Sequence, residues 1–411
     1  AIESSNPSES HHVAMAVTKK GTNVPRRNRD KHDRLSQALE RVGRRFDQTP
    51  LSCIGSKLKE IVRDVQNGLL AGQVAQEQSN KLANYLEGIV ERLPQSFGDR
   101  FRFDAGMIAA IAEEWNAGGT QLSSMLLPRP SAEWGHQSVA MPTYSDQSAH
   151  VIDLVLTPGD DNLDDIDLLT YPFLGHELGH NALFKHEAVF SEAFEKQLQQ
   201  HINGMLRQSL ADRGTAKVKS KAIVGQTRRV WGATANHFNW AHEIAVDLIA
   251  LWTCGPAYLA TFHDVLDDSQ LDPFQVGQSH PPYEVRAKAL IHAAGKLGWS
   301  AQCHKLTETM QSWGRSDWHR GRNNQYAALA SPSLVADCAD IALETCEALR
   351  LPKCTPVSMQ ALSDKLNRGD TPELGTELIL AACLVREENN EATYVEWERR
   401  VIRAHLQDIT L

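Results

Sequence analysis

The chain has 411 residues, of which 42% are hydrophobic and 23% charged, and its formal net charge at pH 7 is -9. This composition is ordinary for a globular protein, and the acidic excess excludes any general attraction to nucleic acid or an anionic membrane. Seven cysteines form no C-x-x-C pair, so we expect reduced thiols in a cytoplasmic protein rather than a disulfide framework. We also expect no membrane span, since no apolar run approaches the roughly 18 to 20 residues that one needs.

The first part of the chain changes character twice. Residues 1–30 are polar and unpatterned, so we expect a flexible tail. From 31 to 130, Leu, Ile and Val recur at helical spacing, which predicts an N-terminal helical subdomain. Residues 151–156 (Val-Ile-Asp-Leu-Val-Leu) are rich in β-branched side chains and end at Thr-Pro-Gly, which predicts a short strand.

The run H-E-L-G-H at residues 176–180 is a complete H-E-x-x-H motif. On a helix, residues four apart lie on one face, so His176 and His180 can direct two imidazoles at one metal ion. The Glu177 carboxylate beside them can reach a metal-bound water, as in zinc peptidases. A proline and several aspartates upstream favour a helix start. At Gly179 the missing side chain leaves room for substrate or for a neighbouring backbone.

Two residues compete as the third ligand of a catalytic zinc, which usually has three protein ligands and one open position. His186 has the spacing of H-E-x-x-H-x-x-G-x-x-H, but Leu183 replaces the glycine that would break the helix. If the helix continues, His186 faces away from the metal. Glu243 is the better candidate, because it lies in the apolar helical run 239–252, where a carboxylate is costly unless paired or metal-bound.

The same run supplies two further polar residues. Asp247 lies one turn after Glu243 and is expected to fix the ring of a ligand histidine, His176, by accepting its other N–H. His242 is a rival ligand, although it lies about 100° around the helix from Glu243. An amphipathic helix with two solvated acids is the alternative interpretation of this run.

Three blocks of sequence together resemble a known family. H-E-L-G-H is followed by E-I-A-V-D at 243–247 and by S-H-P-P-Y-E-V-R at 279–286. This is the order of motifs in the CAAX prenyl protease/HtpX-type zinc metallopeptidases, which are gluzincins with H-E-x-x-H, E-x-x-x-D and S/T-H-P-x-x-x-x-R. The resemblance spans about residues 150–295, and three blocks in order are more specific than any one.

The resemblance implies a mostly helical peptidase core with an edge strand that holds extended substrate by strand addition. The strand at 151–156 would take this role, and its substrate-binding residues would be Val151, Asp153 and Val155. His280 or Tyr283 would donate a hydrogen bond to the transition state, and Arg286 would brace its segment or pair with an acid. The familiar members are mostly integral membrane proteins, so their membrane and prenyl-substrate properties are not expected here.

The sequence therefore predicts a mainly α-helical (α+β) protein, with a gluzincin-like metallopeptidase core and a small β-sheet at 131–300 and a C-terminal helical subdomain at 301–411. We expect a zinc endopeptidase that acts on a protein or peptide, binds one Zn²⁺ per chain and has no nucleic-acid partner. His176, His180 and Glu243 would bind the zinc, and Glu177 would be the general base. The alternatives are a zinc-stabilised regulatory or binding protein with a latent or inactive site, and a hydrolase of non-peptide amides.

Overall fold

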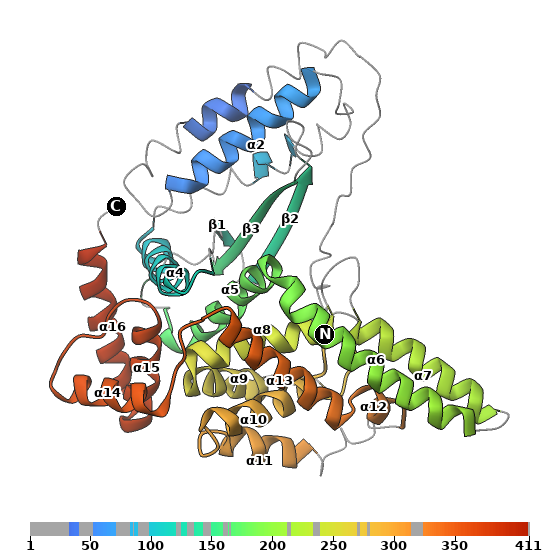
Figure 1. Cartoon of the computed structure of the whole chain (residues 1–411). Coiled ribbons are helices and arrows are strands. Elements are labelled where there is room, and N and C mark those ends of the chain that lie inside the picture. Colours follow the sequence, from blue (N-terminus) through green and yellow to red (C-terminus); the bar gives the residue numbers. More distant parts are fainter. Residues whose placement is uncertain are drawn as a thin grey trace, which may run out of the picture. The chain divides into compact units, whose positions relative to one another are not determined.

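The computed structural model describes residues 33–40, 52–70, 83–84, 86–88, 98–120, 125–129, 135–142, 149–158, 163, 166–211, 215–232, 239–268, 272–277, 280–313 and 324–409. These residues are mostly helical (Figure 1), as the predicted mainly α fold class requires. The chain forms two compact units: unit 1 comprises 1–109, 123–166 and 399–411, and unit 2 comprises 110–122 and 167–398. The predicted tail at 1–30 lies outside the described residues, and the predicted boundaries near 130 and 300 stay predictions.

Unit 1 contains helix α2, part of α4 and a three-stranded sheet. Their bounds are α2 Ser52–Leu70, α4 Asp99–Ala117, β1 Met125–Arg129, β2 Gly135–Pro142 and β3 Ala149–Pro158. The buried hydrophobic residues among the described side chains of α2 are Leu58, Ile61, Val62 and Val65, whose spacing of three and four residues places them on one face of the helix.

Strand β3 contains Val151, Asp153 and Val155, and it is the middle strand in the order β1-β3-β2. β1 pairs with it in parallel from Leu154 to Pro158, and β2 pairs antiparallel from Ala149 to Leu156. An incoming peptide needs unpaired backbone groups at a sheet edge, whereas the Val155 region has a partner on each side. The prediction of an edge strand is therefore wrong for 154–156, and it stays a prediction for 151–153, which pair with β2 alone among the described residues. Near-continuous apolar sequence is typical of a central strand.

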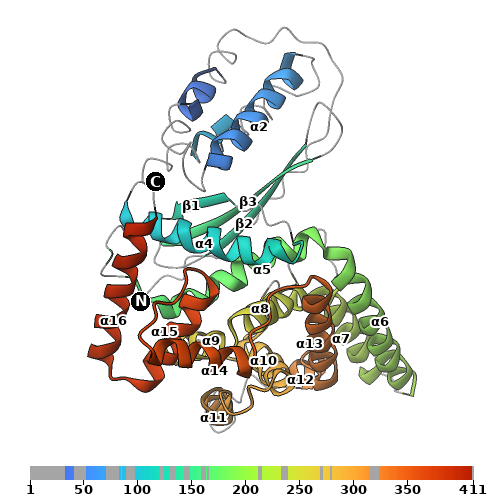
Figure 2. The same cartoon turned by 60° about the vertical axis from the view of Figure 1, so that its left-hand side comes forward.

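Unit 2 is built around α8, and its other elements follow in chain order. The bounds are η3 Leu168–Thr170, α5 Pro172–Lys185, α6 Glu187–Ala211, α7 Thr215–Trp231, α8 Trp240–Cys254, α9 Pro256–Asp268, α10 Tyr283–Leu297, α11 His304–Trp313, α12 Asn324–Leu329, α13 Pro332–Ala348, α14 Pro356–Asn367, α15 Thr376–Glu388 and α16 Glu391–Asp408, whose last residues belong to unit 1. Helices α5, α9, α10 and α13 pack against α8 (Figure 1). In both views α6 lies beside α7, and α14 packs against α15 (Figure 2).

Helix α8 is buried along its whole length. Its N-terminus is capped by Asn239, whose side chain accepts a hydrogen bond of 2.9 Å from the backbone N–H of His242. A helix that is apolar on most faces is stable only inside a protein core. The carboxylates of Glu243 and Asp247, which are 1% and 0% exposed, are therefore held away from water by the fold itself.

Two glycines allow α5 to lie close against α8. Gly175 and Gly179 are four residues apart and so share a face of α5. A Cβ at Gly179 would lie 3.3 Å from side-chain atoms of Val246 and Ile249, and one at Gly175 would lie 3.3 Å from Cys254 Sγ. The room predicted at Gly179 is thus filled by α8, and this close packing brings the motif helix to the helix that carries Glu243.

Replacing Gly179 by Leu should separate these helices and weaken metal binding. Forcing a large side chain into packed surroundings costs about 1–3 kcal/mol, and the two helices hold different ligands. We expect a lower free energy of unfolding and weaker zinc binding, measured by denaturation and by chelator competition. Gly204→Leu is the control, because a Cβ at Gly204 in α6 meets nothing within 4 Å. Equal zinc affinity in both variants would contradict this account of α5 packing.

The turn before α5 is held by a buried carboxylate. Glu398 of α16 accepts hydrogen bonds from the Leu168 N–H (2.7 Å) and the Tyr394 hydroxyl (2.8 Å). Burial raises the pKa of Glu398 to about 7, against these hydrogen bonds and with help from the charges of Asp167 and Glu391. The side chain is 5% exposed, so the folded protein favours the neutral carboxyl.

Glu398→Gln should make the protein less sensitive to rising pH. A carboxyl with a raised pKa stabilises the fold below the pKa of the unfolded chain, and this contribution is lost as the pH rises from about 4.5 to about 7. Glutamine keeps the accepting oxygen without the charge. We measure the free energy of unfolding of both proteins by urea denaturation. The difference between variant and wild type should shift in favour of the variant by up to roughly 3 kcal/mol from pH 5 to pH 8. The control is Glu396→Gln, at an exposed position of the same helix. If Glu398→Gln and wild type differ in unfolding free energy by the same amount at pH 5 and pH 8, the prediction is refuted.

One described segment, Tyr326–Ala348, is long and apolar enough to cross a membrane by length and composition alone. More than half of its apolar window is buried inside the protein, and a break separates α12 from α13 within it. A buried core helix meets the same criterion, and α13 packs against α6, α8 and α10. The expected absence of a membrane span stays a prediction.

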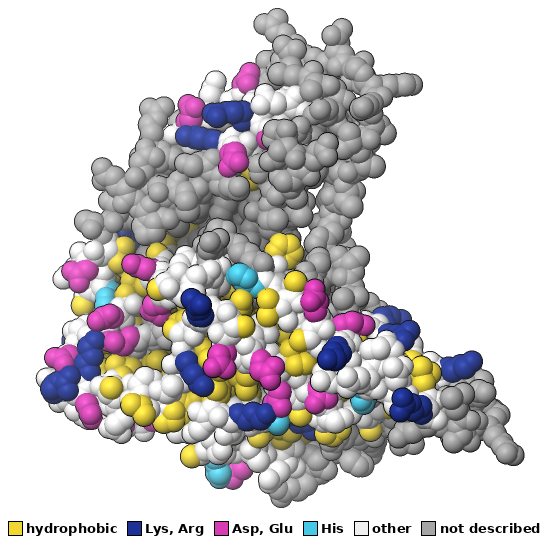
Figure 3. All heavy atoms as spheres, viewed as in Figure 1, with side chains coloured by type: hydrophobic (Ala, Val, Ile, Leu, Met, Phe, Trp, Pro, Cys, Tyr) yellow, Lys and Arg dark blue, Asp and Glu magenta, His cyan; other side chains and the backbone are white. Residues whose placement is uncertain are grey.

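The face drawn in Figure 3 gives no strong indication of a binding partner. There, acidic, basic and hydrophobic side chains are interspersed over the described residues. Such a mixed surface is usual for a folded protein. The expectation of no nucleic-acid partner likewise stays a prediction.

Candidate metal centre

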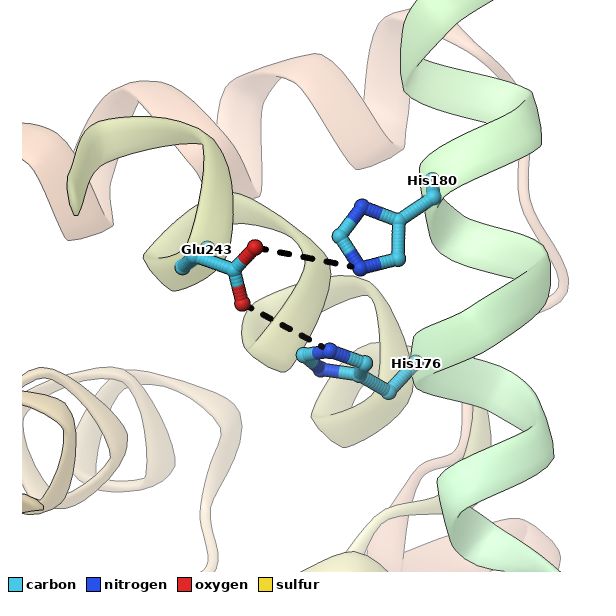
Figure 4. A group of neighbouring side chains, drawn as sticks. All are labelled: His176, His180 and Glu243. Atoms are coloured by element: carbon cyan, nitrogen blue, oxygen red, sulfur yellow. Dashed lines mark ion pairs between the residues drawn. The ribbon is translucent and has the colours of Figure 1, made fainter. Parts of the chain in front are cut away.

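His176, His180 and Glu243 lie together inside unit 2. The two histidines project from α5 toward the Glu243 carboxylate of α8 (Figure 4). His176 Nε2 is 3.8 Å from Glu243 Oε2, and His180 Nε2 is 4.0 Å from Oε1. All three residues are buried, and one donor atom from each lies within 4.8 Å of the others. Among the described residues, this is the group of histidines, cysteines and acids that could hold a metal ion.

The chemistry of this group fits a metal ion. Glu243 Oε1 is buried and has no hydrogen-bond partner among the described residues, and such an oxygen is costly unless something compensates it. Tetrahedral zinc with ligands at about 2.0–2.1 Å would bring neighbouring donor atoms to roughly 3.4 Å. One donor atom from each residue lies within 4.8 Å of the others, so these separations would need to close by at most about 1.4 Å.

Asp247 holds the ring of His176 from behind. Its Oδ1 lies 2.9 Å from His176 Nδ1, and Arg286 donates to both carboxylate oxygens at 2.7 and 2.6 Å. Burial alone would raise the pKa of Asp247, but the charge and hydrogen bonds of Arg286, with those of His176, hold it well below its usual range. Asp247 is therefore ionised and accepts the Nδ1 proton, which leaves His176 Nε2 to face the metal group.

Three carboxylates surround His176. Burial would lower its pKa, but the hydrogen bond and charge of Asp247, together with two nearby glutamates, raise it above the ordinary value. The glutamates are Glu177 and Glu243. A buried pocket whose carboxylates favour a cation also suits a divalent metal ion.

The loop before α10 brings His280 to the solvent side of the group. His280 Nε2 is 3.8 Å from Glu243 Oε2, while its side chain is 59% exposed. Trp240 at the start of α8 donates from Nε1 to the Gly277 carbonyl at 3.1 Å. A Cβ at Gly277 would lie 2.6 Å from the His280 carbonyl oxygen, so a larger residue at 277 would force the backbone to shift.

The other predicted residues have clear places. Tyr283 begins α10, where its ring meets Phe262 edge-on at 6.3 Å and lies 5.9 Å from the Arg286 guanidinium. Helix α5 ends at Lys185 with His186 as its C-cap, and His186 is not part of the metal group. His242 is also outside that group, and its Nε2 lies 3.0 Å from His180 Nδ1.

Sequence reasoning missed Tyr258 of α9. It is fully buried, and its hydroxyl donates to Asp247 Oδ1 at 2.5 Å. A buried tyrosine needs a partner for its hydroxyl, but nothing in the spacing between Tyr258 and Asp247 identifies the partner. Tyr258 and Arg286 together satisfy the carboxylate that orients His176.

No family model, curated protein or solved structure matches the chain. The class of the site therefore follows from its own geometry: a buried two-histidine, one-glutamate group able to bind a metal ion.

Proposed function

We propose that this protein is a zinc-dependent endopeptidase of the gluzincin type, similar to the CAAX prenyl protease/HtpX family. The observation that carries the proposal is the convergence of His176, His180 and Glu243 around a buried carboxylate oxygen that has no other partner. Two imidazoles and a glutamate form the ligand set of zinc peptidases such as thermolysin. A zinc ion bound there would activate water at neutral pH and polarise a carbonyl group.

The other residues of the site have separate proposed roles in the reaction. Glu177 takes a proton from the attacking water and passes it to the leaving amine. His280 reaches the group from the solvent side, where it can donate a hydrogen bond to the oxyanion of the transition state. Tyr283 is the alternative donor. Asp247 fixes the ring of His176, and Arg286 keeps Asp247 charged.

The intact base argues for an enzyme over the alternative of a zinc-stabilised regulatory protein. A structural zinc site is typically closed by four ligands, often cysteines, and needs no base. Here the ligand set has three members, and Glu177 follows the first of them. A latent or inactive site is the outcome that a negative activity test would support.

The geometry of the metal group supports hydrolysis of an amide bond more strongly than it supports a particular class of substrate. Pairing of β3 on both sides at 154–156 weakens the argument that 151–156 binds extended peptide, so a non-peptide amide again competes. Peptide remains the proposed substrate because of the three-block resemblance. The test is to incubate the zinc-loaded full chain with a proteome-derived peptide library and with N-acyl amino acids, and to identify products by mass spectrometry. New peptide termini absent with Glu177→Gln would support the proposal, and products only from N-acyl amino acids would overturn its endopeptidase part.

A further inference from the structure

His242 lies directly behind one of the two ligand histidines. Its Nε2 is 3.0 Å from His180 Nδ1, and the side chains of both residues are buried. The ring planes differ by 17° and the centroids are 5.1 Å apart. The centroid separation exceeds the nitrogen separation by roughly the width of one ring. This is expected only when the two nitrogens lie on the line between the centroids, so the rings meet edge to edge in nearly one plane. This is the geometry of an in-plane N–H···N hydrogen bond.

Such a bond needs one donor and one acceptor, and the metal group decides which is which. His180 Nε2 faces Glu243 Oε1 at 4.0 Å, and it can bind a metal only through an unprotonated nitrogen. The proton of the neutral His180 ring must then be on Nδ1, which donates it. His242 Nε2 is therefore the acceptor.

The two ligand histidines consequently have different supports. His176 donates to the Asp247 carboxylate, whereas His180 donates to a neutral imidazole. Partners of this kind fix the tautomer and the orientation of a ligand ring. We propose that His242 is a positioning residue that holds His180 in its metal-binding tautomer, an inference that rests on the proposed metal site.

The fold makes His242 suitable for this role. It lies in the first turn of α8, where its backbone N–H is fixed by the Asn239 cap, and the next residue is Glu243. One turn of helix therefore supplies the third ligand and orients the second. A rigid turn that presents both groups preorganises the site before a metal arrives.

Two substitutions of His242 distinguish the effect of its hydrogen-bond acceptor from the effect of the volume that its ring fills. His242→Gln can place an amide oxygen near the present position of Nε2, while His242→Leu fills the space without an acceptor. In the full chain, zinc affinity measured by chelator competition should fall roughly 10- to 100-fold for His242→Leu. It should stay close to wild type for His242→Gln. Cobalt(II) in place of zinc gives visible absorption bands that report ligand geometry, and they should change for Leu and persist for Gln.

The outcomes distinguish this role from the others. If wild type and both variants bind zinc equally, the positioning role is refuted while the metal site stands. If Gln loses as much affinity as Leu, with the metal-free proteins melting like wild type, His242 acts as a ligand or through its ring alone, which also overturns the proposal. If wild type binds neither zinc nor cobalt, the proposed function itself fails.

Discussion

Glu177→Gln should reduce hydrolytic turnover by at least about 100-fold while one zinc stays bound. General acid–base catalysis contributes roughly 10²- to 10⁴-fold, and glutamine cannot accept the proton of water. The zinc ligands are His176, His180 and Glu243 in our proposal, so the substitution leaves the metal set intact. Turnover on a substrate found by the library test and zinc content measured on the same sample would check both halves of the prediction.

The exposed Glu192 of α6 provides the matched control for this variant. Glu192→Gln makes the same chemical change on a helix of the same unit, outside the metal group, and should leave turnover unchanged. Loss of zinc from Glu177→Gln would show that Glu177 is a ligand. Full activity in that variant would mean that another group is the base.

Glu243→Ala should abolish zinc binding at micromolar concentrations. Even the partners of metal ligands are worth roughly 10- to 100-fold in affinity, so the loss of a ligand should exceed about 100-fold. Zinc should also stabilise wild type by roughly 4 kcal/mol when free zinc is a thousand times its dissociation constant. The variant should show no such gain, which thermal or urea unfolding with and without zinc would measure.

His186→Ala is the control for the ligand assignment. His186 caps the end of α5 and is not among the three grouped donors, so its loss should leave zinc affinity unchanged. Retention of zinc by Glu243→Ala together with its loss from His186→Ala would reverse the assignment. It would also place the site in the class of H-E-x-x-H-x-x-G-x-x-H enzymes.

The parts of the site that follow from helix periodicity could be predicted from the sequence. His176 and His180 share a face because they are four residues apart, and so do Glu243 and Asp247. The apolar run 239–252 predicts a core helix, and the structure has α8 at Trp240–Cys254. A carboxylate placed in such a helix needs a compensating partner, which is why Glu243 was preferable to His186.

The parts that depend on contacts between distant segments could not be predicted. The sequence of β3 predicts a strand, but whether a strand is central or at an edge depends on β1 and β2, which pair from elsewhere in the chain. Tyr258 reaches Asp247 from the next helix, and no periodic pattern links them. The roles of His242 and of the Gly175–Gly179 face depend on how α5 packs on α8, which local spacing does not specify.

Zinc K-edge X-ray absorption of the full wild-type chain, loaded with one equivalent of zinc and freed of excess metal, tests the central claim most directly. We expect nitrogen and oxygen neighbours alone at about 2.0–2.1 Å, with the outer scattering of two imidazoles. The buried cysteines are the competing ligands, and burial raises the pKa of Cys254 and of Cys354 to about 12, so they should remain thiols. A sulfur neighbour near about 2.3 Å, or a chain that retains no zinc, would contradict the proposed metal centre.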